Sequence, residues 1–268
     1  MADVRIGIVG CAGRMGRMLA QEVARTKGCK LAGGSEQPGH DVLGSDLGIL
    51  VGLGRLGIGI SDNPAALFAD TDAVLDFTSP EASVRHAVLA AKHGTLHVIG
   101  TTGISGDGEA AIRAAAAKAP IVWAPNYSMG VTLLFDLVER AAATLDARYD
   151  IEIVEMHHRH KVDAPSGTAL GLGRAAAKGR AVVLEQVAAR ARDGITGARP
   201  VGAIGFAVLR GGDVVGDHSV VFAGEGERLE LTHRAAGRQI YAQGAVRAAL
   251  WGQGKPPGLY TMRDVLGL

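Results

Sequence analysis

The residues best suited to chemistry lie in one short stretch, 155–170, with the sequence EMHHRHKVDAPSGTAL. Three histidines, an arginine and a lysine are adjacent at positions 157–161, and a Pro-Ser-Gly-Thr turn follows at 165–168. A hydrophobic core has no use for five adjacent hydrogen-bond donors, and titratable groups at this density are typical of a functional site. The turn could also open a helix, whose first N–H groups bind anions. The stretch therefore predicts a site for an anionic ligand.

The overall composition is that of an ordinary globular protein. The 268 residues suffice for one large domain or two moderate ones, and 21% charged residues with a formal net charge of +1 do not indicate a nucleic-acid-coating protein. Cys11 and Cys29 match neither a metal-ligand spacing nor a disulfide framework, so we expect both to be buried and to pack like small hydrophobic residues. Two free cysteines also fit a reducing compartment. The chain begins without the regions of a secretory leader and contains no apolar run of about 18 residues. We expect a cytoplasmic protein with neither a membrane nor a nucleic-acid partner.

A glycine-rich turn near the start of the chain predicts a phosphate site. The β-branched run 4–9 reads as a strand, Gly10, Gly13 and Gly16 follow it, and apolar residues at helical spacing come next. Such a turn delivers free N–H groups at a helix N-terminus, where they and the helix dipole attract a pyrophosphate. The G-x-x-G-x-x-G spacing departs from the usual G-x-G-x-x-G, so the order of strand, turn and helix carries the prediction.

An acidic residue after the second predicted strand strengthens the dinucleotide interpretation. Strand 29–36 ends in Glu36, about 20 residues beyond the glycine turn, where dinucleotide sites hold the ribose hydroxyls. The 2′-phosphate of NADPH favours a basic residue at the next position, but this chain has Gln37 there. The sequence therefore predicts a preference for NADH over NADPH. Arg14 in the turn could partly substitute for that cation.

Strands and helices then alternate, which predicts a parallel sheet with helices on both faces. Residues 39–59 lack a clean period and read as a long loop or irregular hairpin. The following elements are expected as strands at 73–78, 96–99 and 121–124 and as helices at 80–93 and 107–119. Ligands of such sheets bind at the carboxyl ends of the strands, so the turns at Gly10, Glu36, Thr78, Gly100 and Asn126 should converge.

The pattern changes after residue 128 and predicts a second domain. A long helix begins near Met129, with one apolar face formed by Leu133, Leu134, Leu137, Val138 and Ala141. Strand 151–155 leads into the histidine stretch, a short helix covers 169–178, and strands at 204–209, 214–222 and 228–233 are joined by predicted hairpin turns at 210–213 and 224–227. We expect a Rossmann-like α/β domain, 1–128 with 238–268, and an α+β domain with a mixed or antiparallel sheet, 129–237.

Four motifs together resemble the 4-hydroxy-tetrahydrodipicolinate reductase family, also called dihydrodipicolinate reductase, of bacterial lysine and diaminopimelate synthesis. They are the stretch 155–170, Gly-Arg-Met-Gly at 13–16, Gly-Thr-Thr-Gly at 100–103 and Pro-Asn-Tyr-Ser at 125–128. The resemblance covers essentially the whole chain, and the histidine stretch is its specific signature.

The resemblance implies a role for each matching residue. His157 corresponds to the family's proton donor or acceptor and Lys161 to a second proton donor, whereas His158, Gly167 and Thr168 match substrate-binding positions. The implied cofactor-binding residues are Gly10, Cys11, Ala12, Gly13, Arg14, Met15, Glu36, Gln37, Gly100, Thr101, Thr102, Ala124, Pro125, Asn126 and Tyr127. Relatives that favour NADPH carry a basic residue at position 37, and some carry one at position 79, where this chain has Ser79. A homotetramer assembled through the second domain's sheet is also implied.

The chemistry of the implied substrate, a small cyclic imine with two carboxylates, fits the residues. A helix that opens at Ser166, Gly167 and Thr168 offers N–H donors and a hydroxyl to one carboxylate, and the cationic cluster offers charge to the other. Hydride transfer from the nicotinamide pushes electrons toward the ring nitrogen. Lys161 can stabilise that charge and His157 can supply the proton. Hinges near Ser128 and at 236–238 would let the second domain close over the nicotinamide.

Other interpretations of the stretch are weaker. His157 and His160 lack a third metal ligand at a recurrent spacing, and Arg159 and Lys161 beside them disfavour zinc, so no metal site is predicted. Arg159 and His160 are left without a role. Outside this reductase, the alternatives are a non-catalytic dinucleotide sensor, which would need no donor cluster, and another small-acid dehydrogenase, which would lack the dicarboxylate-binding turn.

Overall fold

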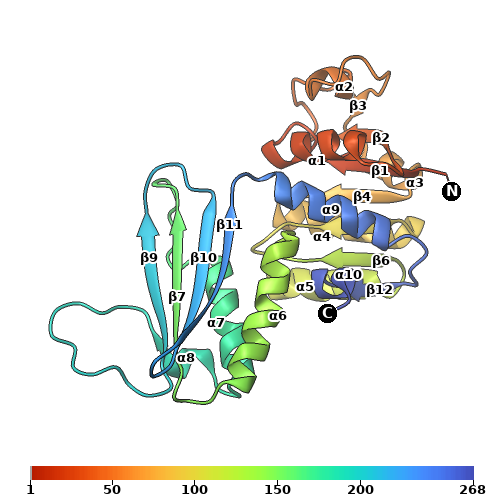
Figure 1. Cartoon of the computed structure of the whole chain (residues 1–268). Helices are drawn as coiled ribbons and strands as arrows, with labels where there is room; N and C mark the ends of the chain where they lie inside the picture. The colour runs from red at the N-terminus through yellow and green to blue at the C-terminus, as the bar shows by residue number, and fades with distance from the viewer. Residues whose placement is uncertain (1) are drawn as a thin grey trace. The chain divides into compact units, whose positions relative to one another are not determined.

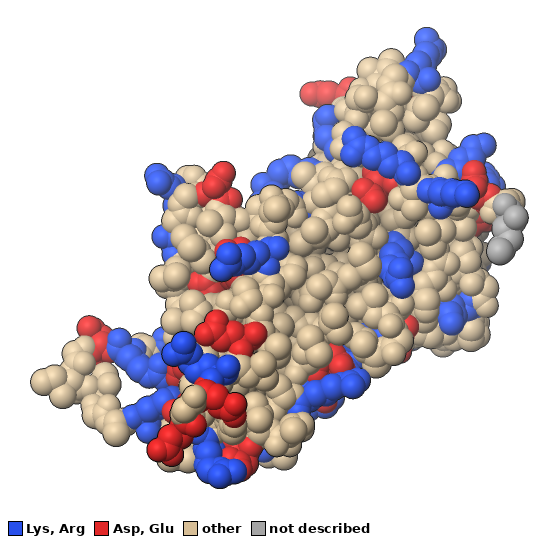
Figure 2. All heavy atoms as spheres, viewed as in Figure 1, with Lys and Arg blue, Asp and Glu red and all other residues tan. Residues whose placement is uncertain are grey.

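The computed structural model describes residues 2–268, which form two compact units. Unit 1 comprises Met1–Ser128 and Gln239–Leu268, and unit 2 comprises Met129–Arg238. Among residues 2–268, no helix is both long enough and apolar enough to cross a membrane. Figure 2 shows basic and acidic side chains interspersed on one face, in keeping with the net charge of +1.

Unit 1 is built on a seven-stranded parallel sheet with the strand order β12-β6-β5-β4-β1-β2-β3 (Figure 1). Its strands are β1 (Val4–Val9), β2 (Cys29–Ser35), β3 (Ile60–Ser61), β4 (Ala73–Asp76), β5 (Leu96–Ile99), β6 (Pro120–Trp123) and β12 (Gly258–Tyr260). The central strands β1, β4 and β5 are largely buried, as their mostly apolar sequences predict. Strands β2 and β3 are added on one side of β1, and β4, β5 and β6 are added on the other side. The carboxyl ends of β1 and β4 therefore flank the switch point at which such sheets bind ligands.

Helices of unit 1 pack as two groups of neighbours. Helix α1 lies beside α9, whereas α4 contacts both α3 and α5. Their bounds are α1 (Arg14–Arg25), α2 (Leu47–Leu50), α3 (Pro64–Ala69), α4 (Pro80–His93), α5 (Gly106–Ala116), α9 (Gln239–Trp251) and α10 (Met262–Leu266). The Rossmann-like fold predicted for this part of the chain is confirmed, including the helix at 80–93. Helix α4 has Ser79 as its N-cap, Pro80 in its first turn and left-handed Gly94 at its end.

The prediction of a long loop or irregular hairpin at 39–59 was only partly right. The segment contains helix α2, and its one bridge joins Asp46 to Gly59. The carboxylate of Asp46 accepts hydrogen bonds from the backbone N–H groups of Ile49, Leu56, Gly57 and Ile58. A side chain, rather than a repeating backbone pattern, therefore organises this segment, and hydrophobic periodicity does not reveal it.

Unit 2 contains a five-stranded mixed sheet with the order β11-β10-β7-β9-β8. Its strands are β7 (Asp150–His157), β8 (Ala188–Ala189), β9 (Ile204–Arg210), β10 (Gly216–Ala223) and β11 (Arg228–Ala235), and its helices are α6 (Met129–Thr144), α7 (Gly167–Gly179) and α8 (Leu184–Val187). Strand β7 pairs parallel with β9 and antiparallel with β10. Buried side chains of the sheet, including Ile153 and Val220, form one core with Leu172 of α7.

Two details of unit 2 differ from the predictions. Residues 210–213 do not form a hairpin, because β7 lies between β9 and β10 and pairs with both. The turn at 224–227 does join an antiparallel pair, β10 and β11. On α6, Leu134 and Val138 are buried as predicted, but Leu133 and Leu137 are 44% and 41% exposed. The buried face of α6 is therefore displaced from the predicted one, and Val131, Thr132, Asp136 and Ala142 are buried beside Leu134 and Val138.

Candidate active site

The glycine turn of unit 1 has the close backbone contacts that a phosphate site requires. Strand β1 ends at Val9, Gly10 adopts a left-handed φ of 65°, and α1 begins four residues later. A Cβ atom on Gly16 would overlap the carbonyl oxygen of Gly10, so a larger residue would push α1 away from the turn. Within residues 2–268, no side chain caps the N-terminus of α1. Its first N–H groups are therefore available to an anion.

A cavity of about 920 Å³ opens beside this turn. Gly10, Ala12 and Gly13 line it together with Glu36 and Gln37, which follow β2. This volume is within the range of small-molecule and cofactor sites. A dinucleotide therefore fits the residues present, with phosphates at the turn and a ribose at the acidic residue.

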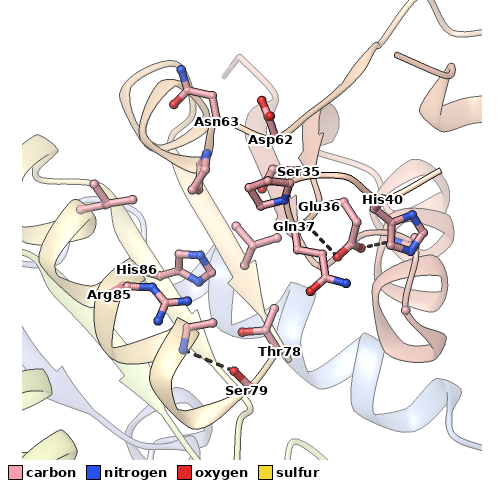
Figure 3. A pocket seen from close by; sticks show the side chains of 18 of the residues that line it. Ser35, Glu36, Gln37, His40, Asp62, Asn63, Thr78, Ser79, Arg85 and His86 are labelled. Atoms are coloured by element: carbon pink, nitrogen blue, oxygen red, sulfur yellow. Dashed lines mark hydrogen bonds between the residues drawn. The ribbon is translucent and has the colours of Figure 1, made fainter. Parts of the chain in front are cut away.

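Glu36 is held in place by the turn itself. Its carboxylate accepts hydrogen bonds from the backbone N–H of Ala12 at 3.1 Å and from that of Gln37 at 3.1 Å. In the view of Figure 3, Arg85 and His86 of α4 lie across the pocket from Glu36 and Gln37. Among the described carboxylates, none forms an ion pair with Arg85, so its charge is available to a ligand.

A buried carboxylate that sequence reasoning missed supports the opposite wall. Asp76, at the end of β4, is fully buried and accepts hydrogen bonds from the Thr78 hydroxyl at 2.6 Å, from His86 Nδ1 at 2.8 Å and from His97 Nε2 at 3.1 Å. Burial alone would raise the pKa of Asp76, but the hydrogen bonds from the two histidines lower it. Thr78 and His86 line the cavity. The ionised Asp76 therefore fixes two residues of the pocket wall.

The other predicted cofactor residues lie outside the lining of this cavity. Cys11 and Tyr127 are buried, and the Tyr127 hydroxyl donates to the carbonyls of Ile99 and Val122, so neither side chain faces a ligand. Thr101 is also buried and accepts from the Ser83 hydroxyl at 2.7 Å. The predicted residues that do not line it are Cys11, Arg14, Met15, Gly100, Thr101, Thr102, Ala124, Pro125, Asn126 and Tyr127. The segments 100–102 and 124–127 follow β5 and β6, at the same edge of the sheet as the turn.

In unit 2, strand β7 runs two residues beyond its predicted end at Glu155 and so includes His157. Because side chains alternate along a strand, Glu155 and His157 share its buried face, with 1% and 8% exposure. The Nδ1 atom of His157 lies 2.5 Å from a carboxylate oxygen of Glu155. Arg210, the last residue of β9, forms a two-pronged ion pair with the same carboxylate at 2.8 and 2.9 Å. Glu155 therefore joins the predicted proton donor to a second strand.

The N-terminus of α7 meets this carboxylate. The backbone N–H of Ser166 donates to Glu155 at 3.0 Å, and the Ser166 hydroxyl accepts from the N–H of Ala169 as the helix cap. Ser166 is 2% exposed, so both of its polar groups serve the fold. Gly167 and Thr168, which begin the helix, occupy the positions where backbone N–H groups lack intrahelical acceptors. Backbone N–H groups at such a helix start can bind an anion.

The remaining residues of the histidine stretch divide by exposure. Arg159 and His160 are exposed, whereas His158 and Lys161 are half-buried. Lys161 Nζ forms an ion pair with Asp163 at 2.7 Å, and Arg210 donates to the carbonyl oxygen of Asp163 at 2.6 Å. Contacts therefore link His157 and Lys161 in one network through Glu155, Arg210 and Asp163.

His218 of β10 is a third buried group that the sequence analysis did not select. Its Nε2 lies 3.0 Å from the Ser166 hydroxyl, and its ring is 4% exposed. Burial, and then the neighbouring His157, lower the pKa of His218 to about 4. Of the missed groups, Glu155 could have been found from the alternation along β7. Arg210 lies 55 residues from Glu155 and His218 lies 52 residues from Ser166, and no local pattern connects them. Among the described residues, no group of three or more His, Cys, Asp or Glu side chains is arranged to hold a metal ion.

The parallel sheet, the glycine turn at α1 and the acidic residue after β2 are features of a dinucleotide-binding α/β protein, and a second α+β unit carries a basic site. The sequence matches the domain families described as dihydrodipicolinate reductase, N-terminus, over residues 4–127 and C-terminus over 130–266. The chain therefore belongs to the dihydrodipicolinate reductase family.

Individual relatives agree with this assignment. The chain is 58% identical over 268 residues to the 4-hydroxy-tetrahydrodipicolinate reductase of Parvibaculum lavamentivorans, with 100% and 99% of the two chains covered. It is 55% identical over 269 residues to the enzyme of that name from Dinoroseobacter shibae, with both chains fully covered. A solved structure of dipicolinate-bound dihydrodipicolinate reductase from Paenisporosarcina sp. TG-14 has a TM-score of 0.77 at 23% identity, with 98% of each chain covered. That likeness concerns the fold.

Proposed function

We propose that the chain reduces 4-hydroxy-tetrahydrodipicolinate, or the dihydrodipicolinate formed from it, to tetrahydrodipicolinate with NADH or NADPH, in lysine and diaminopimelate biosynthesis. Family membership supports the reaction and the pathway. The observation that carries the proposal is the connected network of unit 2, in which His157, Lys161 and the start of α7 are joined through Glu155 and Arg210. It offers a proton donor, a cation and N–H donors to one small anionic molecule.

Unit 1 is proposed as the dinucleotide-binding part. Residues 10–15 would hold the pyrophosphate, Glu36 the adenosine ribose, and 100–102 with 124–127 the nicotinamide side. A bound nicotinamide dinucleotide would supply the hydride, which is chemistry of the cofactor itself. The left-handed Gly10 and the uncapped start of α1 in the described structure support the phosphate assignment.

Unit 2 is proposed as the substrate-binding and oligomerisation part. Gly167 and Thr168 would bind one substrate carboxylate through their N–H groups, and His158 would contribute to binding. Lys161 would stabilise charge at the ring nitrogen, and His157 would donate the proton. Lys161 is half-buried, and its ion-pair partner Asp163 is exposed to solvent. An exposed ion pair is weak, which supports the proposal that Lys161 can leave Asp163 and pair with a substrate.

We further propose a preference for NADH over NADPH. Gln37 and Ser79 line the pocket where relatives that favour NADPH carry basic residues, and the Glu36 carboxylate would repel a 2′-phosphate. Arg85, on the facing wall, would keep NADPH usable. Gln37 is therefore expected to set the preference and Arg85 to moderate it.

A homotetramer and a cytoplasmic location complete the proposal. Exposed apolar side chains on the unit 2 sheet, Leu209 on β9 and Leu229 on β11, support contact with other copies through this sheet. Both cysteines are unpaired, in keeping with a reducing compartment. Cys11 is buried as expected, whereas Cys29 is only half-buried.

The test is oxidation of NADH and of NADPH by the purified protein in the presence of substrate made by the preceding synthase. We expect turnover with both and a higher kcat/KM with NADH. His157→Gln and Lys161→Ala should each lower kcat by about 100-fold, the usual contribution of a positioned proton donor. Dinucleotide binding without turnover would favour a sensor, and turnover of a different small acid would favour another dehydrogenase.

A further inference from the structure

The carboxylate of Glu155 receives two hydrogen bonds at each of its oxygens. One oxygen accepts from Arg210 Nη2 at 2.9 Å and from the Ser166 N–H at 3.0 Å. The other accepts from Arg210 Nη1 at 2.8 Å and lies 2.5 Å from His157 Nδ1. The side chain is 1% exposed. This constellation is fixed from three directions, by two strands and the start of α7.

The protonation state of Glu155 decides which atom of His157 carries a hydrogen. Burial alone would raise the pKa of Glu155, but its hydrogen bonds with Arg210, His157 and Ser166 lower it, so the carboxylate is ionised at neutral pH. An ionised carboxylate only accepts hydrogen bonds. The Nδ1 atom of His157 must therefore be the donor, and in the neutral ring Nε2 is left as the acceptor.

The surroundings of Nε2 suit an atom that exchanges a proton. On the β10 side the neighbouring residue is Gly216, where a Cβ atom would lie 3.0 Å from Nε2. His218 packs edge-on beside the ring, but its own Nε2 is engaged with the Ser166 hydroxyl. The strand that faces His157 thus lacks a side chain at the position that would cover Nε2.

We propose that Glu155 is a positioning residue for the reduction. It keeps the hydrogen of His157 at Nδ1, so that Nε2 takes up a proton from solvent before the reaction, gives it to the substrate, and is left as the acceptor of the neutral ring. Arg210 and the Ser166 N–H balance the negative charge, so that the carboxylate orients the imidazole without binding its proton permanently. This inference rests on the proposed role of His157 in proton transfer.

The tautomer can be measured without any substitution and without activity. Histidine ¹⁵N NMR of the full-length wild-type protein, assigned with His157→Gln, distinguishes a ring protonated at Nδ1 from one protonated at Nε2. At alkaline pH we expect the Nδ1-protonated form for His157. A ring protonated at Nε2 would overturn the inference even if the enzyme is fully active.

A matched pair of variants tests the consequence for turnover. Glu152 lies on the opposite face of the same strand, where it pairs with Arg192 and Arg199, so Glu152→Gln is the control for Glu155→Gln. We expect Glu155→Gln to lower kcat by about 10- to 100-fold with a smaller change in KM and to mix the two tautomers of His157. Glu152→Gln should do none of these.

The double variant separates positioning from general stability. If Glu155 acts through His157, then Glu155→Gln in a His157→Gln background should cost almost no further activity. Additive losses would contradict the inference. If His157→Gln alone leaves kcat unchanged, the proposed role of His157 fails, whereas the tautomer measurement still decides the role of Glu155. Should Glu155→Gln fail to fold, the wild-type tautomer remains the deciding result.

Discussion

The ring of His157 lies edge-on to the ring of His218, with centroids 5.0 Å apart and planes inclined at 75°. The two histidines differ in partner, because His157 contacts the Glu155 carboxylate and His218 contacts the Ser166 hydroxyl. Only His157 contacts a carboxylate directly, although the charge of Glu155 also acts on His218 from the neighbouring strand. The pair therefore places a ring held by a carboxylate beside a buried ring whose lowered pKa keeps it neutral near pH 7.

The neutral His218 makes stability depend on pH. Its pKa is lowered from 6.5 to about 4 in the folded protein, so the unfolded chain takes up a proton first as pH falls. The stabilisation is present above pH 6.5 and is lost as pH falls toward 4, by a total on the order of 3 kcal/mol. Calorimetric Tm measured across this range should fall less steeply for His218→Gln than for wild type. Burial also lowers the pKa of His97, so some slope should remain. The exposed His93→Gln is the control and should keep the wild-type slope.

Gly216→Ala should slow turnover while the protein stays folded. The added methyl would lie 3.0 Å from His157 Nε2, and the backbone at this position is not in the left-handed region, so the main effect is to cover that atom. We expect kcat to fall by about tenfold or more, as for a misplaced proton donor. Gly211→Ala is the matched control, since its methyl would meet only the end of Met156 at 3.4 Å. Equal kinetics in the two variants would argue against Nε2 as the exchanging atom.

Gly16→Ala should weaken dinucleotide binding. Its Cβ would overlap the Gly10 carbonyl and lie 2.7 Å from Cys11 Cα, so the turn and α1 must separate. Overpacking of this kind costs about 1–3 kcal/mol, and if that strain falls on the bound turn, NADH affinity measured by calorimetric titration drops about tenfold. Gly106→Ala, where no described atom lies within 4 Å of the new Cβ, should bind NADH like wild type.

Arg85 and Gln37 should act in opposite directions on cofactor choice. Removing the Arg85 guanidinium should raise KM for NADPH by about tenfold and change KM for NADH little, because only NADPH carries a 2′-phosphate to pair with it. Gln37→Arg should lower KM for NADPH by a similar factor. Arg113→Ala, at an exposed position outside the pocket lining, is the control. If Arg85→Ala affects both cofactors equally, Arg85 binds a part common to both.

The unit 2 sheet should carry the contacts between subunits. Leu229 on β11 is 42% exposed, and an aspartate there would bring a charge into an apolar interface. Sedimentation analysis should give a tetramer for wild type and smaller species for Leu229→Asp. Ile49→Asp, 62% exposed on α2 of unit 1, should remain tetrameric. An unchanged mass for Leu229→Asp would place the interface elsewhere.

Local patterns predicted most of the elements but not all of their partners. The helix at 80–93 was predictable because Ser79, Pro80 and the glycine after His93 mark both of its ends. The position of β7 between β9 and β10 was not predictable, because adjacent strands in sequence usually pair, and here the pairing skips a strand.

The candidate site divides in the same way. The donors of the stretch 155–170 were predictable from residue type, and the glycine turn was predictable from the order of strand, turn and helix. Asp76, Arg210 and His218 act through contacts across 10 to 55 residues of sequence, so only the folded chain reveals them. Asp76 also follows directly on an apolar run, so the sequence indicates only the end of a strand at this position and not a buried carboxylate.

The return of the chain to unit 1 affects the order in which the protein can be completed during synthesis. Unit 2 is continuous from Met129 to Arg238, so all of its strands have been made before residue 240 leaves the ribosome. Unit 1 must wait for α9, which packs beside α1, and for β12, which extends the sheet beyond β6. The part of α1 that packs on α9 therefore stays uncovered while the whole of unit 2 is translated, so unit 1 exposes apolar surface for longer than unit 2 during synthesis.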